Sequence, residues 1–150
     1  MIVYPDTSFL CALYREQDNS KQADAFFRDL TQPLPVTALV LFEFRQSIRW
    51  QTFQNHKDAS KGFGAAEGAQ MLADLEDDLS DARLRVAPVD WAKVISAAEH
   101  LSARHTGKGG HRGFDILHIA TALELGAKEF LTFDARQSAL AMAAKLRVKP

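Results

Sequence analysis

Cysteine is almost absent from this chain, since Cys11 is the only one among 150 residues. A single cysteine excludes an intrachain disulfide framework and any zinc site built on several thiolates, and it fits a reducing compartment. Neither sign of charge is in excess, because 18 Lys and Arg against 19 Asp and Glu leave a net charge of -1. The whole-protein positive field of many nucleic-acid-binding proteins is therefore missing, and any affinity for a polyanion must be local.

Long hydrophobic runs are missing as well. The longest strongly apolar stretch, residues 36–42, is too short to cross a membrane, and the N-terminus lacks a basic segment followed by an apolar one. We therefore expect a cytoplasmic protein without a membrane partner. The composition that remains, 47% hydrophobic and 25% charged, is ordinary for a globular chain, and the length predicts one domain over residues 1–150.

Short apolar segments alternate with segments of helical periodicity. Strands are expected over residues 2–4, 34–36, 84–89, 129–133 and 146–148. Helices are expected over residues 9–16, 19–30, 38–52, 69–79, 91–101, 114–125 and 135–145, with loops over 55–68 and 106–113 and a peripheral position for the helices beside the first loop. Such alternation indicates an α/β fold, with three α/β/α layers around a central parallel sheet of about five short strands.

Four acidic residues stand in unusual places. Asp6 and Asp134 each follow an apolar strand, and the carboxyl ends of parallel strands are where open sheets bind ligands. Glu43 and Asp115 lie in helices that are otherwise largely apolar. Burying unpaired carboxylates is costly, so we expect all four to share one crevice with a cationic partner.

Each acid also has a simpler structural interpretation. Asp6 and Asp134 could cap helices, Asp115 could interact with its helix dipole, and Glu43 could lie on a solvated helix surface. Taken together, however, four converging carboxylates have no evident set of buried cations. An oxygen-only site without clustered Cys or His favours Mg²⁺, with Mn²⁺ as the alternative, and two such ions can activate water for phosphodiester cleavage.

Three segments resemble the PIN domain, a metal-dependent ribonuclease fold, and most of all the VapC-type toxins of bacterial toxin-antitoxin pairs. They are IVYPDTSFL near the N-terminus, VTALVLFEFRQ, and HRGFDILHIATALELGAKEFLTFDARQ. The resemblance spans nearly the whole chain and is weakest over residues 55–82. It implies an RNA substrate, a cognate antitoxin and a homodimer joined through helices of the first half.

By this resemblance the family's metal-binding acids fall on Asp6, Glu43, Asp115 and Asp134. The hydroxyl residue that follows the first acid falls on Thr7 or Ser8. We expect these residues to help bind substrate, for example by orienting a metal-bound water, or else to cap the first helix. Family members often carry a further acid beyond the last aspartate, where Arg136 stands here. We therefore expect one well-occupied Mg²⁺, with a second recruited by substrate.

Basic residues near these acids are candidates to contact phosphate. Lys108, His111 and Arg112 precede Asp115 on the expected loop, and Arg45, Arg49 and Arg136 are further candidates. His118 follows Asp115 by one turn. We interpret it as a core histidine or one that supports the acids from behind, because a hard-cation site has little use for imidazole.

Other functions fit less well. A phosphatase with an aspartyl nucleophile commonly needs a second acid two residues after Asp6, where Ser8 stands, and a receiver-type phosphoacceptor domain does not account for Glu43. A catalytically inactive PIN-like binding domain and a housekeeping RNA-processing nuclease remain open as alternatives to a toxin ribonuclease.

Overall fold

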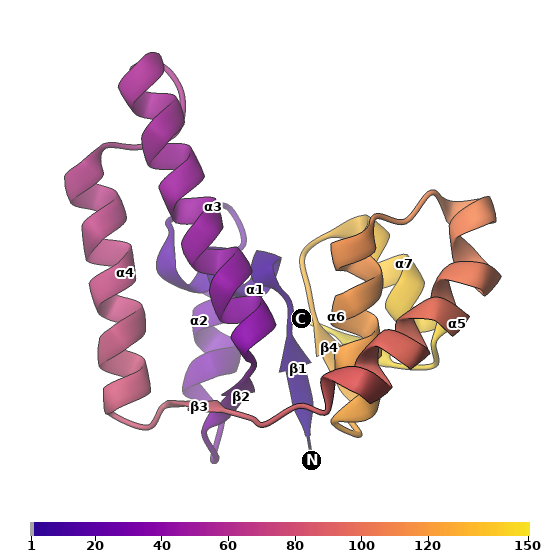
Figure 1. Ribbon diagram of the computed structural model, residues 1–150. Helices are drawn as coiled ribbons and strands as arrows, with labels where there is room; N and C mark the ends of the chain where they lie inside the picture. Colours follow the sequence, from indigo (N-terminus) through magenta and orange to yellow (C-terminus); the bar gives the residue numbers. More distant parts are fainter. Residues whose placement is uncertain (1) are drawn as a thin grey trace.

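The computed structural model describes residues 2–150 (Figure 1). Met1, the first residue of the expected domain, lies outside the described range. Within that range the chain forms seven helices and five strands. In chain order they are β1 (Val3–Pro5), α1 (Thr7–Tyr14), α2 (Ser20–Arg28), β2 (Leu34–Val36), α3 (Ala38–Lys57), α4 (Ala65–Ser80), β3 (Leu84–Val86), α5 (Trp91–Gly109), α6 (Gly113–Glu124), β4 (Glu129–Leu131), α7 (Ala135–Ala143) and β5 (Arg147–Lys149).

The strands pair in parallel, as predicted, but in two hydrogen-bonded ladders. One ladder has the order β1-β4-β5 and the other pairs β2 with β3. Strands β1 and β2 contact each other between the ladders. Each of these strands has three residues and one of them is proline, Pro5 or Pro35, which cannot donate a ladder hydrogen bond. The scarcity of donors explains why the central sheet is interrupted here.

Successive side chains of β1 and β4 point to opposite faces of the sheet, and this creates the three layers. Val3 and Leu131 point into one hydrophobic cluster, whereas Tyr4 and Phe130 point into another. Figure 1 shows α1 to α4 on one side of the strands and α5 to α7 on the other. The predicted α/β/α architecture is confirmed.

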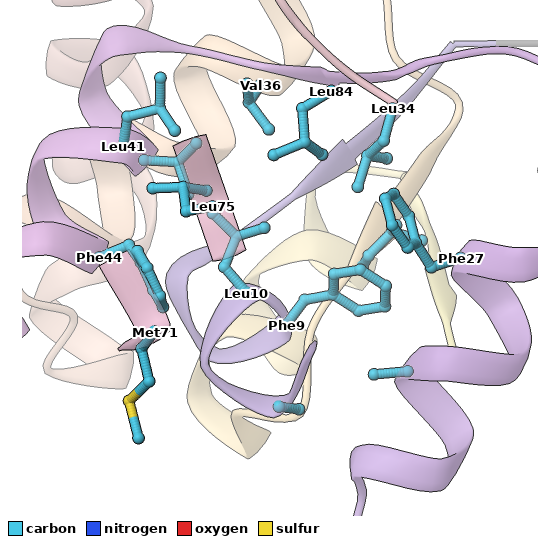
Figure 2. Close-up of a cluster of buried hydrophobic side chains, with 14 of the residues drawn as sticks. Phe9, Leu10, Phe27, Leu34, Val36, Leu41, Phe44, Met71, Leu75 and Leu84 are labelled. Carbon is cyan, nitrogen blue, oxygen red and sulfur yellow. The ribbon is translucent and has the colours of Figure 1, made fainter. Parts of the chain in front are cut away.

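The larger cluster lies on the side of α1 to α4 (Figure 2). Phe9 and Leu10 of α1 pack there with Phe44 of α3, and α4 contributes Met71 and Leu75. Helix α4 lies at the outer edge of this side, as expected, and buries one of its faces in the core (Figure 1).

The other cluster surrounds α6, which is buried on most sides as expected. Gly126 adopts a left-handed φ of 69° just after this helix, a conformation that favours glycine. Helix α4 begins at Ala65, inside the expected loop, and two helices continue further than predicted: α3 to Lys57, and α5 to Gly109 before left-handed Gly110 ends it. Their last turns are polar and face solvent, so hydrophobic periodicity gave no signal for them.

The parallel pairing of β1 with β4 positions the acids. Because neighbouring parallel strands end at the same edge, the residues that follow them meet there. The backbone amide of Asp6 donates to the carbonyl of Leu131 at 2.9 Å, which places Asp6 beside the chain leading to Asp134. Across residues 2–150, no helix is both long enough and apolar enough to span a bilayer.

Candidate active site

Asp6 lies at the centre of the candidate site and is 2% exposed. One of its oxygens, Oδ1, accepts hydrogen bonds from the Ser8 hydroxyl at 2.6 Å and the Phe9 amide at 3.0 Å. The other, Oδ2, accepts from the Thr132 hydroxyl at 2.5 Å. Burial raises the pKa of Asp6 above its ordinary value, although these three hydrogen bonds act in the opposite direction. Asp6 is also the N-cap of α1, so the alternative interpretation of Thr7 or Ser8 as the cap is wrong.

Thr132 connects Asp6 to Asp134. While its hydroxyl donates to Asp6, its oxygen accepts from the Asp134 amide at 3.0 Å. The Asp134 carboxylate caps α7 by accepting from the amides of Arg136 at 2.7 Å and Gln137 at 3.0 Å through Oδ1. Asp134 therefore caps a helix and also lies in the candidate site, as Asp6 does.

Asp115 approaches from the first turn of α6. It accepts from the Arg112 amide at 3.4 Å and from the Gln137 side-chain amide at 3.3 Å. Both bonds are long, so they hold the carboxylate only weakly. Gln137 is buried, and sequence analysis assigned it no role in the site. Its position one turn after Asp134 was the available signal.

Glu43 reaches the site from the second turn of α3. Its Oε2 accepts from the Thr7 hydroxyl and from His118 Nε2, the latter at 2.6 Å. Burial by itself would raise the pKa of Glu43, but the hydrogen bonds from His118 and Thr7 and the positive charge of Arg112 outweigh it, and the pKa lies below its ordinary value. Glu43 is thus a bound carboxylate rather than a solvated surface residue.

Behind Glu43, His118 is 1% exposed and lies between two hydrogen-bond partners. Its Nδ1 lies 2.8 Å from the hydroxyl of Tyr4, which is fully buried. The Tyr4 hydroxyl also lies 3.5 Å from the Thr37 hydroxyl. Sequence analysis did not place Tyr4 at the site, because a tyrosine in a short apolar strand is typical of a core.

Hydrogen bonds connect three of the acids. The path runs from Asp115 through Gln137 to Asp134, and from there through Thr132 to Asp6. Glu43 joins at Thr7, the residue after Asp6. Over the described range, no three His, Cys, Asp or Glu side chains are arranged to hold a metal ion as they stand.

The chemistry of the donors nevertheless fits a hard divalent cation. All four acids supply carboxylate oxygens, and both hydrogen bonds to Glu43 go to Oε2. The Gln137 Oε1 atom is buried without a hydrogen-bond partner among residues 2–150. A buried oxygen next to Asp115 and Asp134 would be satisfied by a cation or its hydration shell, and the weakly held Asp115 side chain could turn toward it.

The basic candidates divide into two groups. Arg112 is exposed at the start of α6, and its charge is close enough to lower the pKa of Glu43. Lys108 is exposed in the last turn of α5, and no described contact brings it to the acids. Arg45 pairs with Glu76 of α4 at 2.6 Å. The fold therefore brings Arg112 to the acids through its charge, and it places Arg136 beside Asp134, to which the Arg136 backbone amide donates.

Comparison with protein families gives one match. The chain matches the sequence profile of the PIN domain over residues 3–142, which includes all four acids. Among curated proteins, none matches the chain.

Several solved structures share the fold. Toxin VapC20 of Mycobacterium tuberculosis, described as cleaving the sarcin-ricin loop, is 23% identical with a TM-score of 0.66, and the alignment covers 99% of each chain. FitAcB from Neisseria gonorrhoeae is 15% identical with a TM-score of 0.69, covering 99% of this chain and 97% of that one. VapBC2 from Rickettsia felis, bound to a DNA fragment from its promoter, is 14% identical with a TM-score of 0.65, covering 99% and 98%.

Proposed function

The chain belongs to the PIN domain family, and on that premise we propose that it is a Mg²⁺-dependent endoribonuclease that hydrolyses RNA phosphodiester bonds. The observation that carries the proposal is the hydrogen-bonded path that joins Asp115, Asp134 and Asp6 at one edge of the strands, with Glu43 beside it. Separate capping roles would not require these acids to be linked across α6, α7, β4 and β1.

In this proposal Asp6, Glu43, Asp115 and Asp134 hold the cation. When bound, Mg²⁺ or Mn²⁺ would activate water and neutralise charge on the phosphate. The lowered pKa of Glu43 keeps its carboxylate ionised at neutral pH. Thr7 and Ser8 orient the carboxylates of Glu43 and Asp6 through the hydrogen bonds that they donate.

We assign RNA binding to the basic residues beside the acids. Arg112 would contact a phosphate next to the scissile bond, since its charge already acts on Glu43. Lys108 would contact the RNA farther along, from the end of α5. Because the net charge of the chain is -1, any attraction for a polyanion must come from such local positive charge.

We further propose that the protein is the toxin of a toxin-antitoxin pair and acts in the cytoplasm. The support is its likeness in fold to VapC20 and to toxin-antitoxin complexes such as VapBC2. The expected partner is a small DNA-binding antitoxin encoded next to this chain. Co-expression of that neighbour should restore growth to cells that produce the toxin, whereas a housekeeping nuclease would need no such partner.

Cleavage of RNA by the purified protein, with Mg²⁺ and with chelator, tests the enzymatic proposal. Asp6→Asn and Asp115→Asn should each abolish cleavage, because the amide keeps the volume and removes the charge. Asp90→Asn is the matched control: Asp90 also caps a helix, α5, but lies outside the site, and Asn preserves a cap. Mg²⁺-dependent cleavage by folded Asp6→Asn or Asp115→Asn protein would refute the assignment.

The aromatic face of α3 is where we propose that two copies form a homodimer. Phe42, Trp50 and Phe53 are about half exposed, and the rings of Trp50 and Phe53 stack with centroids 5.6 Å apart. Their spacing places all three on one side of the helix. Clustered exposed apolar side chains of this kind often mark a protein interface.

Sedimentation tests the dimer. The wild-type protein should sediment as a dimer at micromolar concentration and Trp50→Glu as a monomer. Met142→Glu, which changes an exposed apolar residue of α7, should remain a dimer. A monomeric wild-type protein would contradict the proposal.

A further inference from the structure

A buried chain of hydrogen bonds reaches from the core around α6 to the candidate active site. Its members are Tyr4 on β1, His118 on α6 and Glu43 on α3, so it connects three elements. Tyr4 and His118 are both excluded from solvent, and neither is needed to close the hydrogen bonding of a helix or strand. Their short hydrogen bonds, at 2.8 and 2.6 Å, join these two side chains to each other and to Glu43, whereas the Thr37 hydroxyl lies farther from that of Tyr4, at 3.5 Å.

The chemistry of the three side chains determines which of them donates in each hydrogen bond. A carboxylate can only accept, so His118 Nε2 must carry a proton and donate to Glu43. In the neutral imidazole, Nδ1 is then an acceptor, and it accepts from the Tyr4 hydroxyl. The hydroxyl of Tyr4 thus selects the tautomer of His118 whose proton points at Glu43.

This arrangement also selects which oxygen of Glu43 is held. His118 and Thr7 both donate to Oε2, from α6 and from the residue that follows Asp6. The side chain is nevertheless 32% exposed. Glu43 is therefore anchored through one oxygen, and no described residue forms a hydrogen bond with Oε1.

We propose that Tyr4 and His118 are positioning residues for the reaction, which hold Glu43 by Oε2 so that Oε1 faces the reacting centre. This inference rests on the proposed nuclease function. Neither residue contacts RNA. Both act by fixing the rotamer of a carboxylate that would otherwise be free to turn on its flexible side chain.

Four variants test the activity. His118→Leu should lower kcat by about 10 to 100-fold, the loss typical of removing a group that orients a metal ligand, with little change in KM. His118→Gln retains an amide donor that can reach Glu43 and should restore much of the lost kcat. Tyr4→Phe should show a smaller loss. Tyr14→Phe, the matched control, removes the hydroxyl that donates to Asp78 at 2.7 Å away from the site and should leave kcat unchanged.

Outcomes that overturn the inference are specific. If folded His118→Gln and His118→Leu lose the same activity, or if both retain wild-type kcat, His118 does not position Glu43. If Tyr14→Phe loses as much kcat as Tyr4→Phe, the effect of Tyr4 is one of stability alone.

A second measurement reads the protonation of the His118 ring directly and does not depend on activity. Nitrogen-15 NMR of the imidazole rings should show His118 with its proton on Nε2 and an unprotonated Nδ1, and Tyr4→Phe should weaken that preference. A proton on Nδ1 alone would overturn the inference even if RNA is cleaved. Absence of cleavage by a protein with the expected tautomer would instead refute the nuclease proposal, so the two failures are distinguishable.

Discussion

Replacing Thr132 with valine removes one hydroxyl and almost no volume. That hydroxyl donates to Asp6 at 2.5 Å and accepts from the Asp134 amide at 3.0 Å. Asp134 is exposed, so water can replace the bond to its amide. Asp6 is 2% exposed, so its carboxylate has no such substitute. The loss of stability should therefore come mainly from the hydrogen bond to Asp6.

A hydrogen bond to a buried charged group contributes roughly 1.5–3 kcal/mol, so we expect Thr132→Val to lower the free energy of unfolding by about 2 kcal/mol. For a chain of this length that corresponds to a fall in Tm of about 4–8 °C. Thr52→Val is the matched control, because Thr52 only donates back to the Ile48 carbonyl of its own helix. Its Tm should fall by less than about 2 °C.

The loss of stability in Thr132→Val should also depend on pH. The Thr132 hydroxyl favours the ionised form of Asp6, so its loss raises the pKa of Asp6 further. Thr132→Val should therefore be most destabilising near neutral pH and least in acid, where Asp6 is protonated in both proteins. Thermal melts of the metal-free proteins measure this directly. A change in Tm that equals that of Thr52→Val, or that is the same at every pH, would refute the reasoning.

Four further predictions concern the acids and one turn. Burial raises the pKa of Asp6, so at pH values above the ordinary pKa of aspartate the folded state binds more protons than the unfolded state. The stability of the metal-free protein, measured by thermal melts, should therefore fall as the pH rises toward neutral. Millimolar Mg²⁺ should raise Tm at neutral pH in the wild type but not in Asp115→Asn; equal shifts would contradict the site. Induced wild-type protein should arrest bacterial growth, and Asp6→Asn should relieve the arrest. Gly62→Ala should lower the free energy of unfolding by more than about 2 kcal/mol, because φ is 58° and the new Cβ would overlap a backbone oxygen, whereas Gly64→Ala meets no atom and should be tolerated.

Local patterns in the sequence were enough to predict the order of the elements and the layered class. Apolar strands such as the one before Asp6 contrast with helical periodicity elsewhere, and this contrast depends only on neighbouring residues. Caps were predictable for the same reason, as the capping interpretation of Asp6 and Asp134 shows. Boundaries were wrong where the local signal stops: the last turns of α3 and α5 face solvent, and no apolar residue marks them.

The residue types of the candidate site were also accessible from sequence, because acids in apolar surroundings are conspicuous there. Whether Asp6, Glu43, Asp115 and Asp134 together bind a metal stays a prediction. The common edge of Asp6 and Asp134 follows from the parallel pairing of β1 with β4. The alternation of strands and helices predicts parallel strands, but it does not say which strands are neighbours.

Only the tertiary structure decided how those acids are held. Tyr4 and His118 are 114 residues apart, and His118 and Glu43 are 75 residues apart, yet each pair is within hydrogen-bond distance. Periodicity tells which face of a helix or strand is buried, but not which side chain from another layer meets it there. Which side chains meet depends on how the layers pack around β1. There the Tyr4 hydroxyl lies within hydrogen-bond distance of the His118 imidazole, and that imidazole lies within hydrogen-bond distance of the Glu43 carboxylate.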